Sequence, residues 1–145
     1  MKVSIEPGSS LPDTEVIIHC HAVTDEIKEI IALLQLKSYQ VTGWQEGEMH
    51  LLSARDILYI ETVDKKTFLY SRDAVYETPL KLYELEARLE DVGFFRGGKS
   101  LIVNFYHIQS LRPDFGGRLR LTLSNGEACV VSRQYASTLR NKLKE

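Results

Sequence analysis

A series of short extended segments occupies most of the chain after residue 38 and constrains the fold more than any other feature. The segments are rich in Val, Ile, Thr, Tyr and Phe, which favour strands, and they cover residues 39–44, 48–52, 56–62, 67–71, 74–78, 100–111, 117–124 and 128–132. Turn-forming residues separate them at 64–66, 71–73, 113–117 and 125–126, and the Asn-Gly of the last is typical of a type I′ hairpin. This pattern predicts a mainly β (α+β) fold on an antiparallel scaffold.

Two helices are predicted within this β material. The first begins with Thr78 as a cap and Pro79 at the first helical position, and it ends near Gly93, which suits the left-handed conformation that closes helices. Leucines at 82, 85 and 89 give this helix an apolar face. The second helix begins at Ser132 and continues to the C-terminus, with apolar residues at 135, 139 and 143 on one face.

The first 45 residues predict a small strand-helix unit of their own. Strands are expected at 3–5 and 15–22, and Thr24 is typical of the N-cap of a helix whose apolar face has residues 27, 30, 31 and 34. A unit of this size cannot bury its own apolar surface, so we expect it to pack on the rest of the chain, on a second copy or on another protein. The predicted domains are residues 1–45 and residues 46–145.

The cysteines and the N-terminus bear on the compartment. Cys20 and Cys129 lie in apolar strand-like runs without metal-ligand or disulfide-framework spacing, so both are predicted to be buried, reduced thiols. The N-terminus lacks the apolar core of a signal peptide, and no later run is long enough to cross a bilayer. We therefore expect a cytoplasmic protein.

Charge is distributed unevenly along the chain. Lys and Arg total 18 and Asp and Glu total 20, which gives a net charge of −2. Residues 1–55 contain four basic and eight acidic side chains, whereas residues 92–144 contain nine basic side chains and two acidic ones. A basic C-terminal half indicates an anionic polymer as partner, and a solvated charged face is the alternative explanation.

The stretch GFFRGGKSLIVNF at residues 93–105 contains a literal match to the phosphate-loop pattern, ending in Gly98, Lys99 and Ser100. A true phosphate loop follows a strand and continues into a helix whose N-terminus faces the phosphates. Here a helix is predicted before the pattern and a strand after it, and bulky side chains occupy positions 94–96. The stretch is therefore interpreted as a helix-to-strand junction, and nucleotide binding is not predicted.

No set of residues in the sequence predicts catalysis. His19 and His21 share one face of their expected strand, an exposed edge strand, and Cys20 points to the other face, so the three do not converge on a metal ion. His50 and His107 lack a nucleophile or a carboxylate nearby in the sequence. The chain is predicted to be a non-enzyme without metal or cofactor, and only a site assembled from distant residues stays open.

One ordered combination of motifs is far more specific than its parts. An amphipathic helix precedes FFRGGKSLIVN at 94–104, the hairpin sequence RLRLTLSNGEACVV follows at 118–131, and VSRQY at 131–135 opens the last helix. The combination closely resembles the LytTR family of DNA-binding domains, bacterial transcription regulators whose fold is mainly β rather than helix-turn-helix. The resemblance covers about residues 48–143. It departs from the family pattern at Gly97-Gly98, where flexibility would weaken base reading.

The resemblance implies that DNA is recognised by loops projecting from a β-scaffold into successive major grooves. By position, the contact regions are the turn at 64–67, the segment at 99–100 and the junction at 132–133. The DNA-binding residues implied are Lys65, Lys66, Thr67, Arg96, Lys99, Ser100 and Arg133. Asn104 is interpreted as structural, closing a turn through side-chain hydrogen bonds.

The physical chemistry of these residues agrees with that assignment. Lys and Arg pair with guanine in the major groove, while serine hydroxyls and helix-start N–H groups suit phosphate oxygens. Arg133 is expected to be the strongest base reader and Lys99 the second, whereas Arg96 serves either a phosphate or an internal acid. The alternative for the lysines is that they are plain solvated turn residues.

The sequence thus predicts a sequence-specific DNA-binding transcription regulator whose partner is double-stranded DNA, bound at direct repeats in promoters by two copies. The alternative is a protein-interaction module on the same scaffold that binds, or is controlled by, a membrane-associated partner. Many members of the family carry a phosphorylatable receiver, which residues 1–45 are too short to form. Control by abundance, by homodimerisation through the N-terminal helix face, or by a membrane-protein regulator stays open.

Overall fold

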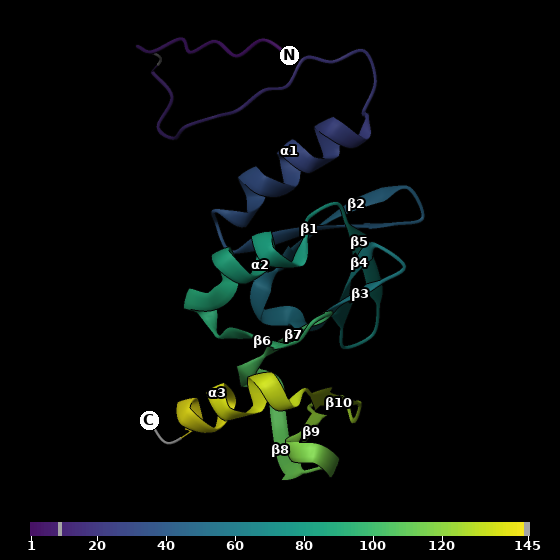
Figure 1. Ribbon diagram of the computed structural model, residues 1–145. Helices are drawn as coiled ribbons and strands as arrows, with labels where there is room; N and C mark the ends of the chain where they lie inside the picture. The colour runs from purple at the N-terminus through teal and green to yellow at the C-terminus, as the bar shows by residue number, and fades with distance from the viewer. Residues whose placement is uncertain (9, 144–145) are drawn as a thin grey trace.

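The strands of this protein form two antiparallel sheets that follow one another along the long axis of the molecule (Figure 1). The computed structural model describes residues 1–8 and 10–143, so Lys144, which was counted in the basic half, lies outside the described residues. The first sheet has seven strands and the second has three. This antiparallel architecture with short helices confirms the predicted mainly β (α+β) class.

The seven-stranded sheet has the order β2-β1-β5-β4-β3-β7-β6. Its strands are β1 (Gln40–Gln45), β2 (Glu48–Ser53), β3 (Ile57–Val63), β4 (Lys66–Ser71), β5 (Val75–Thr78), β6 (Phe94–Gly98) and β7 (Leu101–Asn104). Strand β3 pairs with β4 on one side and with β7 on the other, and the Thr62 N–H donates to the Ser100 carbonyl at 3.0 Å. The β3–β4 and β6–β7 hairpins therefore turn at the same end of the sheet.

The three-stranded sheet has the order β10-β9-β8. Its strands are β8 (Ile108–Pro113), β9 (Leu119–Leu123) and β10 (Ala128–Val131). Leucines 119, 121 and 123 of β9 are buried, while Arg118 and Arg120 are exposed. One face of this sheet therefore packs on the core, and the other face meets water.

Three α-helices accompany the sheets: α1 (Asp25–Leu36), α2 (Leu82–Leu89) and α3 (Arg133–Leu143). Thr24 caps α1 as predicted, because its hydroxyl accepts a hydrogen bond from the Ile27 N–H at 3.4 Å. At the start of α3, the Ser132 carbonyl accepts from the Ala136 N–H at 2.9 Å. The predicted starts of both helices are confirmed.

Helix α2 begins later than the sequence predicted. Thr78 pairs with Thr67 as the last residue of β5, so it is a strand residue, and the N-cap of α2 is Lys81. The predicted end is correct, since a 3₁₀ turn at Glu90–Val92 closes on Gly93 with φ 96°.

Two hydrophobic clusters hold the layers together. The first lies between α1, α2 and the seven-stranded sheet and includes Ala32, Ile60, Leu69 and Leu85, each with no exposed surface. The second lies between α3, the three-stranded sheet and the near side of β3, β6 and β7. Leu121 of β9 and Leu139 of α3 belong to it. Phe94, Ile102 and their neighbours Phe95 and Val103 are buried, as predicted.

The segment 100–111, predicted as one strand, is two strands in different sheets. Strand β7 ends at Asn104, a 3₁₀ turn follows at Phe105–His107, and β8 begins at Ile108. The buried Asn104 amide explains the break, since its Nδ2 donates to the Ile57 carbonyl at 2.9 Å and its Oδ1 accepts from the Tyr106 N–H at 3.1 Å. The turn-closing role predicted for Asn104 is confirmed, but the single strand was wrong.

The N-terminal strands predicted at 3–5 and 15–22 are also wrong. The described residues before α1 form neither helix nor strand, and Figure 1 shows them as an extended segment beyond α1, away from both sheets. A strand needs a hydrogen-bonded partner, and no strand lies beside this segment among the described residues. Cys20 is consequently exposed, so its predicted burial was wrong, and His19 and His21 are exposed too, whereas Cys129 is buried as predicted.

The predicted boundary between residues 45 and 46 stays a prediction. It falls in the turn that joins β1 to β2, which are paired along their whole length from Gln40 with Ser53 to Gln45 with Glu48. Ala32 of α1 and Val41 of β1 belong to the same hydrophobic cluster as Leu85 of α2.

Candidate nucleic-acid interface

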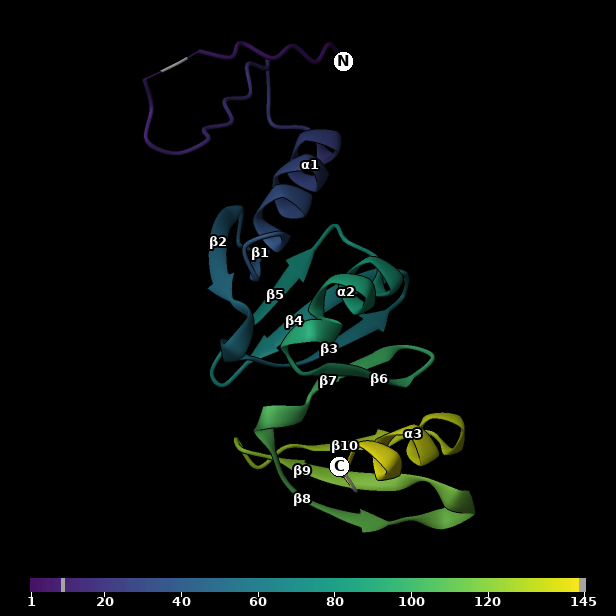
Figure 2. The same cartoon turned by 90° about the vertical axis from the view of Figure 1, so that its left-hand side faces the viewer.

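The three regions expected to contact DNA lie along one edge of the molecule. Figure 2 shows the β3–β4 turn, the β6–β7 turn and the start of α3 on the same side, in this order from the seven-stranded sheet to the three-stranded sheet. The pairing of β3 with β7 brings the first two turns together. A backbone hydrogen bond from the Ser132 N–H to the Gly97 carbonyl, 2.8 Å long, attaches the start of α3 to β6.

The β3–β4 turn has an uncommon backbone conformation. Asp64 and Lys65 have φ values of 50° and 67°, and Val63 pairs with Lys66 on either side of them. Two central residues with positive φ define a type I′ hairpin, which usually needs Asn or Gly. Residues other than glycine that hold such a conformation often mark functional positions, and here the conformation fixes where the exposed Lys65 and Lys66 project.

The type I′ hairpin predicted at Asn125-Gly126 is not formed there. Gly126 has φ 89° while Asn125 has no positive φ, and the Gly126 N–H donates to the Leu123 carbonyl at 2.9 Å. The Leu123 N–H donates to the Glu127 carbonyl at 2.8 Å, which gives a three-residue loop with glycine at its left-handed position.

A cleft of about 380 Å³ joins the first two turns and the start of α2. It is lined by Thr62, Lys65, Thr67, Lys81, Leu82, Tyr83, Arg96, Lys99 and Ser100. Five of the predicted residues are thus brought to one site. Lys81 and Tyr83 were missed by sequence reasoning, although Tyr83 has 68% of its surface exposed and both follow directly on the turn after β5.

The remaining predicted residues stand apart from this cleft. Lys66 is exposed next to the β3–β4 turn but does not line the cleft, and Arg133 is exposed at the start of α3. Thr67 lines the cleft but has only 5% of its surface exposed, since it lies in β4 between Thr62 and Thr78.

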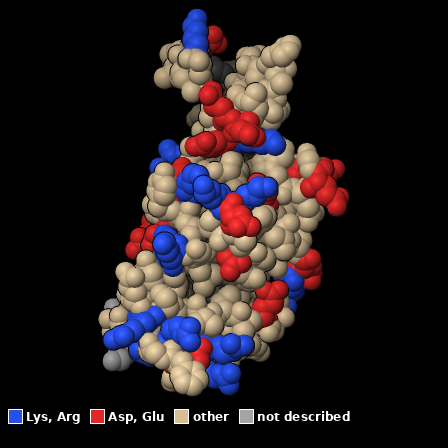
Figure 3. Space-filling model, turned by 45° about the vertical axis from the view of Figure 1, so that its right-hand side comes forward, with Lys and Arg blue, Asp and Glu red and all other residues tan. Residues whose placement is uncertain are grey.

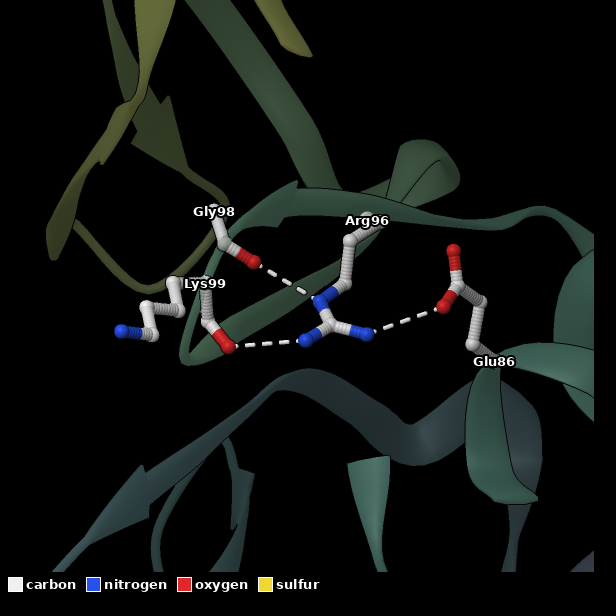
Figure 4. A network of polar contacts seen from close by, with 4 residues as sticks. All are labelled: Glu86, Arg96, Gly98 and Lys99. Atoms are coloured by element: carbon white, nitrogen blue, oxygen red, sulfur yellow. Dashed lines mark hydrogen bonds and ion pairs between the residues drawn. The ribbon is translucent and has the colours of Figure 1, made fainter. Parts of the chain in front are cut away.

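Arg96 fixes the backbone of the β6–β7 turn (Figure 4). Its guanidinium donates to the Gly98 carbonyl at 2.7 Å, to the Lys99 carbonyl at 2.7 Å and to Glu86 Oε1 at 2.9 Å. The ammonium group of Lys99 points away from this network. Of the two roles expected for Arg96, the contact with an internal acid is the one the structure contains.

Gly97 is the residue around which β6 bends. The register between β6 and β7 shifts between Arg96 and Gly98, so Gly97 occupies a bulge. A Cβ at Gly97 would lie 3.3 Å from Leu101 Cδ2 and 3.5 Å from Val131 Cγ2, whereas one at Gly98 would meet nothing nearer than 3.8 Å. Both glycines are buried, and close packing around Gly97 restricts the flexibility expected of the pair.

The charges of this edge are largely unneutralised. Among residues 1–8 and 10–143 the ion pairs are Arg96 with Glu86 and His50 with Glu48, so Lys65, Lys99 and Arg133 form none. Figure 3 shows Lys and Arg side chains gathered at the lower end of the molecule, over the three-stranded sheet. Such a surface attracts a polyanion.

On the opposite side of the molecule, a side-chain hydrogen bond joins the two sheets. Tyr59 donates to Glu127 Oε2 at 2.7 Å, and its ring stacks on Tyr70 with centroids 4.3 Å apart. Burial and the Glu127 carboxylate raise the pKa of Tyr59 above its ordinary value, and burial also raises the pKa of Cys129 to about 12. His107 Nδ1 lies 2.9 Å from Ser124 Oγ, so this histidine has a structural role.

Comparison with protein families matches residues 47–144 to the LytTr DNA-binding domain. The chain belongs to the LytTr DNA-binding domain family. A solved LytTr DNA-binding domain from Bacillus cereus superposes with a TM-score of 0.69 and 31% sequence identity, over 72% of this chain and 96% of that domain. The fold and the resemblance inferred from the motifs are both confirmed.

Similarity to two curated proteins covers the N-terminal region as well. Proteins of Staphylococcus aureus strains NCTC 8325 and COL, each named an uncharacterized HTH-type transcriptional regulator, are 28% identical over 145 residues, with 99% of this chain and 98% of each relative covered. The match to the LytTr family and the names of these relatives support the conclusion that this protein is a DNA-binding regulator. The names of these relatives mention a helix-turn-helix, whereas strands separate each helix from the next in the described part of this chain.

No group of three His, Cys, Asp or Glu side chains within residues 1–8 and 10–143 could hold a metal ion. No helix in the same ranges has the length and apolar character needed to cross a membrane.

Proposed function

We propose that this protein regulates transcription by inserting the β3–β4 turn, the β6–β7 turn and the start of α3 into successive major grooves of a promoter. The observation that carries the proposal is the placement of all three regions on one edge, with the first two joined by Thr62–Ser100 and the last two by Ser132–Gly97. A rigid array of turns can match the repeat of a duplex, because each base contact must arrive at a fixed position.

Arg133 and Lys99 are the base readers in this proposal. Both are exposed, neither is in an ion pair within the described ranges, and Arg presents a fork that matches guanine O6 and N7. At the start of α3, the Tyr135 N–H already donates to the Ser132 carbonyl at 3.0 Å, whereas the N–H groups of Arg133 and Gln134 come too early for the helical ladder and suit a phosphate oxygen.

Lys66 and the cleft residues share the remaining contacts. Lys65, Lys66, Lys81 and Ser100 neutralise or bond phosphates, and Tyr83 adds a hydroxyl at the rim. Arg96 acts by holding the Lys99 backbone, and Thr67 acts by packing, because both are already engaged within the fold. We propose that two copies occupy direct repeats, as the sequence prediction implied.

Selection of duplexes from a random library by the full chain would test this function. The selected duplex should bind with a steep dependence on salt, and Arg133→Ala should weaken binding by roughly 1–3 kcal/mol. Arg140→Ala, an exposed arginine further along α3, is the matched control and should change little. A library that yields no preferred sequence would refute the proposal and favour the alternative, a protein-interaction module bound by a membrane-associated partner.

A further inference from the structure

The turn between β8 and β9 lies on the same edge as the three turns above, next to the start of α3 (Figure 2). A Cβ at Gly117 in this turn would lie 3.2 Å from Arg133 Cγ, so the Arg133 side chain passes directly over the turn. The surface that holds Arg133 therefore continues onto the three-stranded sheet.

Phe115 projects from this turn with 85% of its surface exposed. Its backbone is nevertheless fixed, because its N–H donates to Asp114 Oδ1 at 2.8 Å and its carbonyl accepts from Arg118 Nε at 2.9 Å. The Asp114 N–H donates to the Arg118 carbonyl at 2.9 Å and closes the turn. The fold thus holds an aromatic ring outward in one position.

Arginines lie on the strands that lead into and out of this turn, and they have no acidic partners within residues 1–8 and 10–143. Arg112 of β8 and Arg120 of β9 are directly opposite each other on the exposed face of the sheet, an arrangement in which like charges repel. Neither is in an ion pair within residues 1–8 and 10–143. The nearby acids are engaged, since Asp114 caps the turn and Glu127 accepts from Tyr59 at the other end of β9.

We propose that the β8–β9 turn is a fourth DNA contact and binds the duplex that flanks the three-turn surface. Arg112, Arg118 and Arg120 hold the phosphates of this flanking duplex, and Phe115 inserts its ring into the minor groove of the same duplex. This inference rests on the proposed function. Duplex DNA carries a negative charge for about every 1.7 Å of its axis, so facing arginines about 5 Å apart at their Cα atoms meet several phosphates. Exposed apolar side chains beside cationic ones are the means by which proteins wedge between bases in the minor groove.

The salt dependence of binding tests the arginines. The full chain is titrated with the selected duplex cut to the three-turn footprint and with the same duplex extended by about one helical turn, roughly 10 base pairs, on each side. For the extended duplex, Arg112→Ala/Arg120→Ala should lower the slope of log affinity against log salt by roughly 2, about 0.9 for each phosphate lost. The short duplex should bind both proteins equally. Arg88→Ala/Arg140→Ala removes the same charge from exposed positions elsewhere and should leave both slopes unchanged.

Fluorescence of 2-aminopurine placed in the flanking base pairs tests the ring. Wild-type protein should raise the fluorescence by unstacking the base, Phe115→Ala should abolish the rise, and Phe115→Leu, an apolar wedge, should retain part of it. Equal slopes on the short and extended duplexes, with no fluorescence change, would overturn the inference while Arg133→Ala still supports the function. If no preferred sequence is selected, the function fails, and the arginine variants on a random-sequence duplex still decide whether this turn binds phosphates.

Discussion

The Ser132 N–H and the Gly97 carbonyl are 2.8 Å apart, and this hydrogen bond joins β6, which leads into one of the turns proposed to contact DNA, to the residue that precedes α3. Gly97 occupies the bulge of β6, and Ser132 directly precedes α3. The relative position of Lys99 and Arg133 is therefore set by backbone groups and close packing.

Gly97→Ala should disturb this joint. The added Cβ would be 3.3 Å from Leu101 and 3.5 Å from Val103 and Val131, which we expect to lower the free energy of unfolding by about 1–3 kcal/mol. Gly98→Ala is the matched control, since its Cβ would have only Leu101 at 3.8 Å. Urea denaturation of both variants measures the difference, and equal stabilities would contradict the close packing described for Gly97.

Arg96→Lys should separate charge from geometry. Lysine keeps the positive charge but cannot bond Glu86 and two carbonyls at once. We expect DNA affinity to fall together with a loss of stability on the order of 1–3 kcal/mol, less for the Glu86 part because that side chain is 40% exposed. Full DNA affinity in Arg96→Lys would instead indicate that Arg96 meets a phosphate through its charge alone.

Lys65→Gly should stabilise the fold and weaken DNA binding. Glycine relieves the cost of φ 67°, roughly 1 kcal/mol, and removes an ammonium group from the cleft. Lys66→Gly is the control for stability, because residue 66 has ordinary strand geometry: glycine there also removes a proposed phosphate contact but should destabilise the fold. Thermal unfolding and DNA titration of the pair check this opposition, and a destabilised Lys65→Gly would show that the turn is not strained.

Tyr59→Phe should flatten the alkaline pH dependence of stability. The folded state raises the pKa of Tyr59, so the neutral phenol is favoured on folding and this contribution is complete below the unfolded pKa near 10. It is lost as the pH rises further, because the unfolded chain then releases the proton first. Denaturation at pH 8 to pH 11 should show a smaller decline in Tyr59→Phe than in the wild type. Cys129 contributes a decline of the same sign in both proteins.

The sequence predicted the features whose causes are local. Thr24 caps α1 because its hydroxyl reaches an N–H three residues away, and Gly93 ends α2 because its backbone adopts a positive φ. The predicted turns at 64–66 and 113–117 are confirmed, since each contains residues suited to such turns.

Several of the errors have distant causes. Thr78 does not cap α2 because it pairs with Thr67, and the strand at 100–111 is broken because Asn104 bonds to Ile57, which lies 47 residues away. Segment 15–22 has the composition of a strand but no partner within the described ranges. Lys81 and Tyr83 join the cleft only because folding places the start of α2 beside two hairpin turns, which no sequence spacing reveals.

The exposed thiol of Cys20 affects how any measurement of oligomeric state should be interpreted. Two accessible cysteines on separate chains can oxidise to an intermolecular disulfide during purification, and the resulting covalent pair would have the mass of a homodimer. A noncovalent dimer formed through the N-terminal helix face would keep its mass in reducing buffer and in Cys20→Ser. The buried Cys129 cannot cause this artefact without unfolding.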